Sequence, residues 1–309
     1  MTDPATSDRR WWLIGAGAAM LGAMLFACKG IVAKLLLARG VDFESITGLR
    51  ALIAMPAFIG LAAARHGGKS LMMTPRRAAI TASVAGVLCY YLGALANFYA
   101  LTMIDASIER AIIFSYPAVV VVLQAALRRR LPTAAEALAA LLAYLGVFLA
   151  VGGWHSHVLE ANLVGGLLVL FSAATYAIYY IAAESCVRQI GSVRFTMYSM
   201  SASALALGAH LTLRGHFAAV PRYGGDVWLL LLLISVVCMV FPALLQAEGV
   251  RRIGASAAAV VSAVGPPTTI ALGWLLLDER ITTGQWFGVV AVVGGVLLID
   301  RERRRRGSS

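Results

Sequence analysis

One stretch of this chain occurs twice. Residues 253–299 align on residues 104–150 without a gap, at an offset of 149 positions. Few of the aligned positions are identical. Pro117 nevertheless falls on Pro266, and a proline inside an apolar helical run is harder to match by chance than a small residue. An internal repeat of this length implies two similar halves, and any fold for this chain must accommodate both.

Composition places these halves in a lipid bilayer. Hydrophobic residues make up 60% of the 309 residues and charged residues 13%, with a mean hydropathy of +0.82. Soluble domains carry about 25% charged residues, so this chain cannot cover a surface exposed to water. In a membrane protein, a repeat of this kind predicts a transporter built from two halves.

Ten apolar runs approach or exceed the roughly 20 residues that a helix needs to cross a bilayer. Glycine, proline and polar residues separate them. The runs lie at 11–38, 44–64, 77–101, 107–127, 133–153, 161–187, 194–213, 226–249, 255–277 and 283–300. We therefore expect an all-α integral membrane protein with ten transmembrane helices.

The distribution of Lys and Arg predicts how these helices are oriented. With the N-terminus in the cytoplasm, 18 of the 26 lie on the cytoplasmic side and 5 on the outer side, while Lys29, Lys34 and Arg50 lie within helices. We expect a multi-pass protein of the bacterial inner membrane with both termini cytoplasmic. Its formal net charge of +11 then reflects membrane topology, and we expect no nucleic-acid partner.

Five helices in each half make the two halves opposite in orientation. We expect a first repeat over residues 1–155 and an inverted second repeat over 156–309, together forming one membrane domain. The three arginines at 128–130 are replaced by Leu, Asp and Glu at the aligned positions 277–279, as an inverted insertion requires. Inverted repeats meet near the middle of the bilayer, so we expect the substrate site there.

The second half also carries a pattern that resembles a known family. It consists of GASA at 254–257, Pro266, LDERIT at 277–282, QWFG at 285–288 and GGV at 294–296. Along nearly its whole length the chain is similar to the drug/metabolite transporter superfamily, in its ten-helix branch with two EamA-type repeats. Within that branch it is most similar to bacterial inner-membrane exporters of aromatic amino acids. The resemblance implies transport of a small molecule.

Several predicted helices present small, aromatic and neutral polar residues on one face. Such a wall suits a zwitterion with an apolar side chain, because rings stack on it and polar groups bond its ends. The candidate cavity residues are Lys29, Tyr90, Asn97, Tyr99, Ser115, Tyr176, Tyr179, Tyr180, Gln246 and Ser262. The alternative for each is close helix packing, with the polar groups bonded inside the bundle.

Charges within the helices bear on the substrate. Lys29 is the deepest cation and a candidate partner for a substrate carboxylate, whereas Lys34 and Arg50 lie near helix ends and are expected to snorkel. A strongly anionic substrate would need several buried cations, and Lys29 is the one fair candidate. This argues against such a substrate.

The acidic residues bear on coupling. They fall near the ends of the predicted helices and none lies at a helix centre. Proton-coupled carriers commonly use a buried acid, so we expect facilitated diffusion, with Glu109 and Glu248 as the residues that would serve coupling. Pro117 and Pro266 each remove a backbone hydrogen bond, which predicts either a gating kink or static curvature.

These features predict a monomeric transporter that exports aromatic or apolar amino acids, or similar small metabolites, by alternating access. The first alternative is a proton-coupled exporter of drugs or of another metabolite. The alternative from another class is a membrane-embedded enzyme that modifies lipids. We expect no enzymatic activity, no cofactor and no metal site: His155 and His157 have no third ligand near them, and His210 and His216 are expected at an interface.

Overall fold

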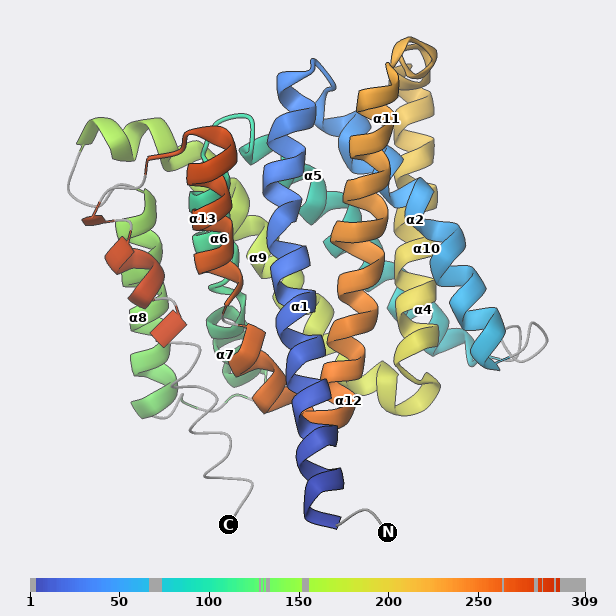
Figure 1. Cartoon of the computed structure of the whole chain (residues 1–309), viewed down its shortest axis with the longest axis vertical. Helices are drawn as coiled ribbons and strands as arrows, with labels where there is room; N and C mark the ends of the chain where they lie inside the picture. The colour runs from blue at the N-terminus through green and yellow to red at the C-terminus, as the bar shows by residue number, and fades with distance from the viewer. Residues whose placement is uncertain are drawn as a thin grey trace.

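The computed structural model describes residues 4–66, 74–127, 129, 131, 134–151, 156–262, 264–280, 283–284, 286–291 and 293–294. Within these ranges the chain forms helices and turns and no strand. Figure 1 shows the helices packed side by side as a bundle, with α1 (Pro4–Ala38) running through its length. We call the end of the bundle where α1 finishes at Ala38 the distal end.

The remaining elements follow in chain order. They are α2 (Phe43–His66), α4 (Arg76–Gly86), η1 (Val87–Gly93), α5 (Ala94–Ala100), α6 (Ala106–Ile113), α7 (Tyr116–Leu127), α8 (Ala134–Val151), α9 (Ser156–Ile190), α10 (Ser192–Leu213), η2 (His216–Ala218), η3 (Val220–Arg222), α11 (Gly225–Leu232), η4 (Leu233–Val240), α12 (Phe241–Ser262) and α13 (Gly265–Leu277).

The predicted apolar, all-helical character is confirmed. By length and composition, the helical segments able to cross a bilayer are Trp11–Ala38, Phe43–Arg65, Arg76–Ala100, Glu160–Val187 and Gly225–Gln246. Large apolar side chains such as Ile80, Leu229 and Trp274 are exposed on the outside of the bundle, as expected for a surface that lipid covers. In the tenth predicted run, 283–300, residues 285, 292 and 295–300 lie outside the described residues, and the boundary between the two repeats stays a prediction.

Two helices contain π-helical stretches that the sequence did not predict. Residues Val87–Gly93 form η1 between α4 and α5, and residues Leu233–Val240 form η4 between α11 and α12. At the offset of 149 positions, η1 aligns on residues 236–242 and so overlaps η4. A π-helical turn inside an α-helix shifts the side chains beyond it and often occurs at functional sites. The two halves therefore share an irregularity at corresponding positions.

The two prolines lie elsewhere than expected within their helices. Pro117 is in the first turn of α7, after a break at Phe114 and Ser115, and Pro266 is in the first turn of α13, after α12 ends at Ser262. The predicted helix start at residue 255 is also wrong, because α12 continues to Ser262. A proline in a first turn loses no intrahelical hydrogen bond, so both follow a helix break rather than kink a continuous helix.

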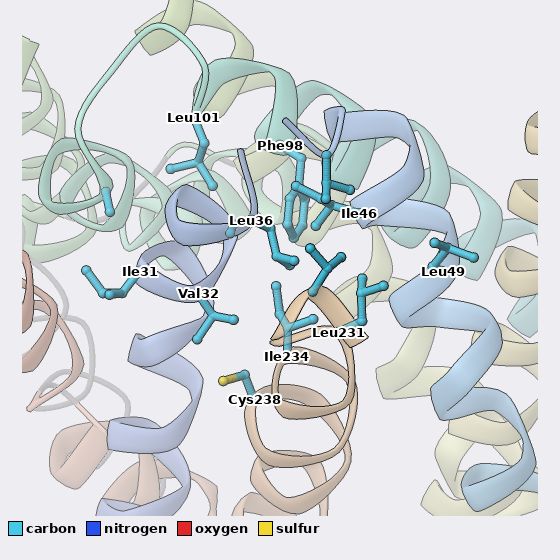
Figure 2. Packing of buried hydrophobic residues seen from close by; sticks show 14 of the residues in the cluster. Ile31, Val32, Leu36, Ile46, Leu49, Phe98, Leu101, Leu231, Ile234 and Cys238 are labelled. Atoms are coloured by element: carbon cyan, nitrogen blue, oxygen red, sulfur yellow. The ribbon is translucent and has the colours of Figure 1, made fainter. Parts of the chain in front are cut away.

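A core of buried apolar residues ties the halves together at the distal end. Figure 2 shows side chains from α1, α2, α5 and the α11–η4 segment meeting there, including Ile31, Ile46, Phe98 and Leu231. Gly40 has φ of +76°, a left-handed conformation that glycine adopts without strain, and it lets the chain turn from α1 into α2. Because α1 and α2 come from the first half and α11 from the second, this core joins the two repeats.

The contact between α4 and α10 depends on the absence of a side chain at Gly86. A Cβ added there would lie 2.2 Å from the carbonyl oxygen and 2.4 Å from the Cα of Ser199 on α10. The Ser199 hydroxyl donates a hydrogen bond of 2.9 Å to the carbonyl oxygen of Ala82, one turn earlier on α4. Backbone therefore packs directly on backbone, as small residues allow in membrane proteins.

We expect Gly86→Ala to destabilise the protein by about 1–3 kcal/mol, because the added methyl group must push α10 away. The measurement is thermal unfolding of the purified protein in detergent. Gly17→Ala is the matched control, since a Cβ at Gly17 meets nothing within 4 Å. Equal melting temperatures for the two variants would contradict the described packing.

Candidate functional site

A buried polar cluster lies where α1, α5 and α6 meet. The Lys29 Nζ atom donates a hydrogen bond of 2.9 Å to Asn97 Oδ1 and pairs with Glu109 Oε1 at 3.2 Å. The Asn97 Nδ2 atom donates to the same Glu109 oxygen at 2.7 Å. The three side chains thus satisfy one another away from water, which a buried charge requires. The structure brings together Lys29 and Asn97, both predicted cavity residues, with Glu109, a predicted coupling residue.

The burial of Glu109 corrects the sequence analysis. Only 1% of this residue is exposed, although sequence position placed it near a helix end. The helix α6 spans only Ala106–Ile113, so Glu109 is near its end. The whole of α6 packs against α1, α9 and α13, and Glu109 is therefore buried despite that position. The argument for facilitated diffusion rested on the lack of a buried acid, and that premise is wrong.

Two further cations are buried beside this cluster, and both were expected elsewhere. Arg50, expected to snorkel, is 6% exposed, and Arg110, assigned to the outer side, is 7% exposed. The guanidinium carbon of Arg50 lies 4.5 Å from the centre of the Phe98 ring, and its Nη1 lies 3.6 Å from Met239 Sδ. In the part of the chain that the structure describes, neither arginine forms an ion pair, and the Nε atom of each is buried without a hydrogen-bond partner.

The Arg110 guanidinium lies near two phenyl rings and beside the start of α13. Its guanidinium carbon lies 5.5 Å from the ring centre of Phe26 and 5.7 Å from that of Phe114. A Cβ at Gly265, the first residue of α13, would lie 2.7 Å from an Arg110 Nη atom. The arginine therefore fills the space that this glycine leaves at the start of α13.

The buried cluster carries an excess of positive charge. Lys29, Arg50 and Arg110 contribute three cations, and Glu109 contributes one carboxylate. A buried charge without a partner is costly. The excess is therefore a place where an anion from outside the chain would be stabilised.

Glu279 is also buried, but its carboxylate serves the fold. One oxygen accepts a hydrogen bond of 2.8 Å from the backbone nitrogen of Ala106. The other accepts from the backbone nitrogen of Ser107 at 3.1 Å and from its hydroxyl at 2.6 Å. A carboxylate at a helix N-terminus satisfies unpaired N–H groups and complements the helix dipole. Glu279 belongs to the LDERIT pattern, and the sequence analysis did not assign it this role.

Five tyrosines form an aromatic wall next to the cations. The ring centres of Tyr90 and Tyr179 are 5.1 Å apart, and those of Tyr116 and Tyr180 are 5.1 Å apart in a stacked arrangement. Tyr176 contacts Tyr90, Tyr116 and Tyr180, and it lies within electrostatic range of both Arg50 and Arg110. The wall therefore adjoins the positive excess. Tyr116 was not among the predicted cavity residues.

Two serine hydroxyls add polar groups to this region. Ser115 lies in the break between α6 and α7, and Ser172 lies on α9, one turn before Tyr176. The Oγ atoms of both are buried without a hydrogen-bond partner among the described residues. Ser115 was predicted as a cavity residue from sequence, whereas Ser172 was not.

The other predicted residues lie outside this group. The Tyr99 ring packs on Phe43 with ring centres 4.9 Å apart, and much of the residue is exposed. Gln246 donates a hydrogen bond of 3.2 Å to the carbonyl oxygen of Ala19, joining α12 to α1. Glu248 accepts a hydrogen bond of 2.5 Å from Arg252, one turn further along α12.

For two predicted residues, Pro117 and Ser262, the structure describes the backbone but not the side chain. His155 lies outside the described residues entirely.

Comparison with known proteins identifies the class. The sequence matches the EamA-like transporter family twice, over residues 13–152 and again over residues 163–300. The chain belongs to this family, and it is a multi-pass membrane transporter with two EamA repeats, as the internal repeat predicted.

The relatives are themselves transporters. The chain is 32% identical over 283 residues to the uncharacterized transporter YcbK of Bacillus subtilis. The aligned region covers 89% of this chain and 87% of that protein. It is 25% identical over 296 residues to the uncharacterized inner membrane transporter YicL of Salmonella typhimurium, covering 93% and 95% of the two chains. A solved crystal structure, at 16% identity, has a TM-score of 0.59 and covers 94% of this chain and 98% of its own. It shows the same fold.

The Lys29–Glu109 pair predicts a specific pattern of stability. We expect Lys29→Met to destabilise the protein by about 3–5 kcal/mol, because it leaves the Glu109 carboxylate buried without its cation. Adding Glu109→Gln to that variant should recover part of the loss, since no buried charge then remains unpaired in the triad. Thermal unfolding of the single and double variants in detergent measures both effects. Strictly additive losses would show that the two side chains are not coupled.

Proposed function

We propose that this transporter carries small organic molecules that combine an anionic group with an aromatic or apolar part. Amino acids with aromatic or apolar side chains are the first candidates. The observation that carries the proposal is the buried positive excess of Arg50 and Arg110 beside the tyrosine wall. The sequence argument against an anionic group rested on a single buried cation, and the described structure contains three.

The chemistry of these groups supports this substrate class. An arginine guanidinium binds a carboxylate through two parallel hydrogen bonds, and burial strengthens such contacts. Tyrosine rings offer flat apolar surface with a hydroxyl at the edge, so they can pack on an apolar substrate and bond its polar end. Arg50 comes from α2 and Arg110 from α6, while Tyr176, Tyr179 and Tyr180 come from α9. The site therefore combines residues of both halves.

Alternating access is the mechanism we propose for this site. Transporters built from repeats place their substrate at the repeat interface and use interrupted helices there. The breaks before α7 and α13 and the π-helical stretches η1 and η4 are interruptions of this kind, in corresponding positions of the two halves. The distribution of Lys and Arg predicts an inner-membrane carrier with both termini in the cytoplasm. Export is the direction that the resemblance to amino acid exporters implies, and we propose that gating occurs at the breaks where Pro117 and Pro266 lie.

Uptake into proteoliposomes tests the substrate class. We expect saturable uptake of phenylalanine, leucine and phenylpyruvate, which share a carboxylate, and none of phenethylamine, which lacks one. Arg50→Gln should raise KM at least about tenfold, because a guanidinium–carboxylate contact is lost. Arg39→Gln is the matched control, since Arg39 pairs with Asp226 at 2.8 Å in an exposed position. Uptake of phenethylamine equal to that of phenylalanine, or equal KM values for the two variants, would contradict the proposal.

The driving force has two candidates, and Glu109 separates them. The substrate gradient alone would suffice for facilitated diffusion, which is our first expectation for the chain. Proton coupling is favoured by one observation, the buried Glu109 carboxylate paired with Lys29. Protonation of Glu109 would release Lys29, and the released ammonium would add to the positive charge available to a substrate anion.

An imposed pH gradient distinguishes these mechanisms. We expect uptake by facilitated diffusion to be the same with and without the gradient. If the gradient accelerates uptake, Glu109→Gln should abolish that acceleration, whereas Glu160→Gln, at an exposed residue of α9, should preserve it. Acceleration that survives in Glu109→Gln would remove Glu109 from any coupling role.

A further inference from the structure

Two carboxylates and two histidines converge at the distal end of the bundle. The Nδ1 atom of His216 lies 3.3 Å from Asp42 Oδ2, and its Nε2 atom contacts Glu44 Oε2. The Nε2 atom of His210 lies 3.5 Å from the same Glu44 oxygen. One ligand atom from each of Asp42, Glu44 and His216 lies within 4.8 Å of the others. All four side chains are at least partly shielded from solvent.

Local backbone structure places these groups. The backbone nitrogen of Ser45 donates a hydrogen bond of 2.8 Å to Asp42 Oδ1, as at a capped helix start, so that Oδ2 is left to face His216. After α10, Gly215 has φ of +74° and turns the chain so that His216 reaches α2. His210, in the last turn of α10, has its Nδ1 atom 3.1 Å from the hydroxyl of Tyr91.

We propose that Asp42, Glu44, His210 and His216 form a binding site for a divalent transition metal ion such as Zn²⁺. Imidazole nitrogen and carboxylate oxygen are the ligands that zinc takes in proteins, commonly four in number. The contact between Tyr91 and His210 Nδ1 is the outer contact that orients a ligating imidazole and leaves Nε2 to the metal. Nothing in the family relationship assigns such a site.

The alternative occupant is a proton. A charged His216 between two carboxylates would account for its own contacts with Asp42 and Glu44. It leaves His210 unexplained, because the Nε2 atom of that residue is buried without a hydrogen-bond partner while facing Glu44. Asp42, Glu44 and His216 place one ligand atom each within 4.8 Å of one another. A metal ion held by these three has the unsatisfied His210 Nε2 atom beside its Glu44 ligand as a fourth donor, and for this reason we favour the metal.

The local charge is compatible with a cation. Asp42 and Glu44 supply two negative charges, and Arg214 is the positive residue that faces them, with its Nε atom 3.5 Å from Glu44 Oε2. The Arg214 side chain is 64% exposed, so it can swing into solvent when a metal ion arrives. The cluster then offers two carboxylates and two neutral imidazoles.

The ligands come from different halves of the chain. Asp42 and Glu44 lie at the start of α2, whereas His210 and His216 lie at the end of α10 and in η2. A metal ion bound here would link the two repeats at the distal end. With the predicted orientation this end faces outward, so the site would respond to metal outside the cell and independently of the transported substrate.

Zinc titration of the full chain tests the proposal. The protein is purified in detergent with an affinity tag that lacks histidine, and Zn²⁺ binding is followed by calorimetry and by the melting temperature. We expect one ion per chain and a higher melting temperature. His216→Gln and Glu44→Gln should each weaken binding at least about tenfold. Asp226→Asn, which removes another distal ion pair, and the double variant His155→Gln/His157→Gln should leave binding unchanged.

A second measurement does not depend on the variants. Co²⁺ bound to the unmodified protein should give the visible absorption of a four-coordinate site with nitrogen and oxygen ligands, and Zn²⁺ should displace it. No saturable binding, or equal binding in His216→Gln and the unmodified protein, would overturn the proposal. A melting temperature that responds to pH between about 5 and 8 but not to Zn²⁺ would also overturn it, in favour of the proton.

Discussion

The ion pair between Lys29 and Glu109 determines how the interior of this protein is organised. An unpaired charge in a medium of low polarity is costly, so the pairing of Lys29 with Glu109 fixes α1 and α6 relative to each other at this point. The short helix α6 is held a second time at its N-terminus, where Glu279 accepts hydrogen bonds from Ala106 and Ser107. All eight residues of α6 are buried, and Ile108, Ile112 and Ile113 pack in an apolar core. The two carboxylates therefore add directional contacts to this packing and fix the position of the helix along the bundle.

This arrangement explains why further charges can lie nearby. Because Arg110 follows Glu109 on α6, the position of this helix also places Arg110 in the interior. Phe26 and Phe114 face its guanidinium. Arg50 is placed similarly, against Phe98 and Met239. Aromatic rings and a thioether partly stabilise a cation while leaving its hydrogen-bond donors available. Such surroundings suit a site that must bind an anion and later release it, because a permanent carboxylate partner would compete with the substrate.

Sequence patterns predicted the parts of this protein that follow from local rules. Apolar runs predicted the helices because a bilayer requires about 20 apolar residues for each crossing, and the repeated stretch predicted the two-repeat family. The deep position of Lys29 followed from its place within the first apolar run, and Lys29 and Asn97 were each predicted as cavity residues from the helices on which they lie. These inferences needed no knowledge of how one helix packs against another.

The remainder depended on contacts between distant residues. Arg50 and Arg110 were assigned to helix ends, since sequence does not reveal that other helices cover those ends. Asp42 and His216 are separated by most of the first half of the chain and part of the second, so no local pattern connects them. The two prolines follow helix breaks because the breaks fall at Phe114 and near Val264, where no sequence rule predicted them.

The π-helical stretch η1 has a consequence for how this gene can change. A π-helical segment accommodates one residue more than the α-helical bonding pattern requires, so loss of one codon within Val87–Gly93 would restore regular α-helical bonding. The ends of the α4–α5 helix would then stay at nearly the same depth and keep their side-chain directions, and the change would be confined to η1, which includes Tyr90. The same deletion in α2 would rotate Arg50 away from Phe98 with no such reserve. Single-residue length variation among relatives should therefore concentrate at η1 and η4, where it would remodel the tyrosine wall without disturbing the membrane crossing.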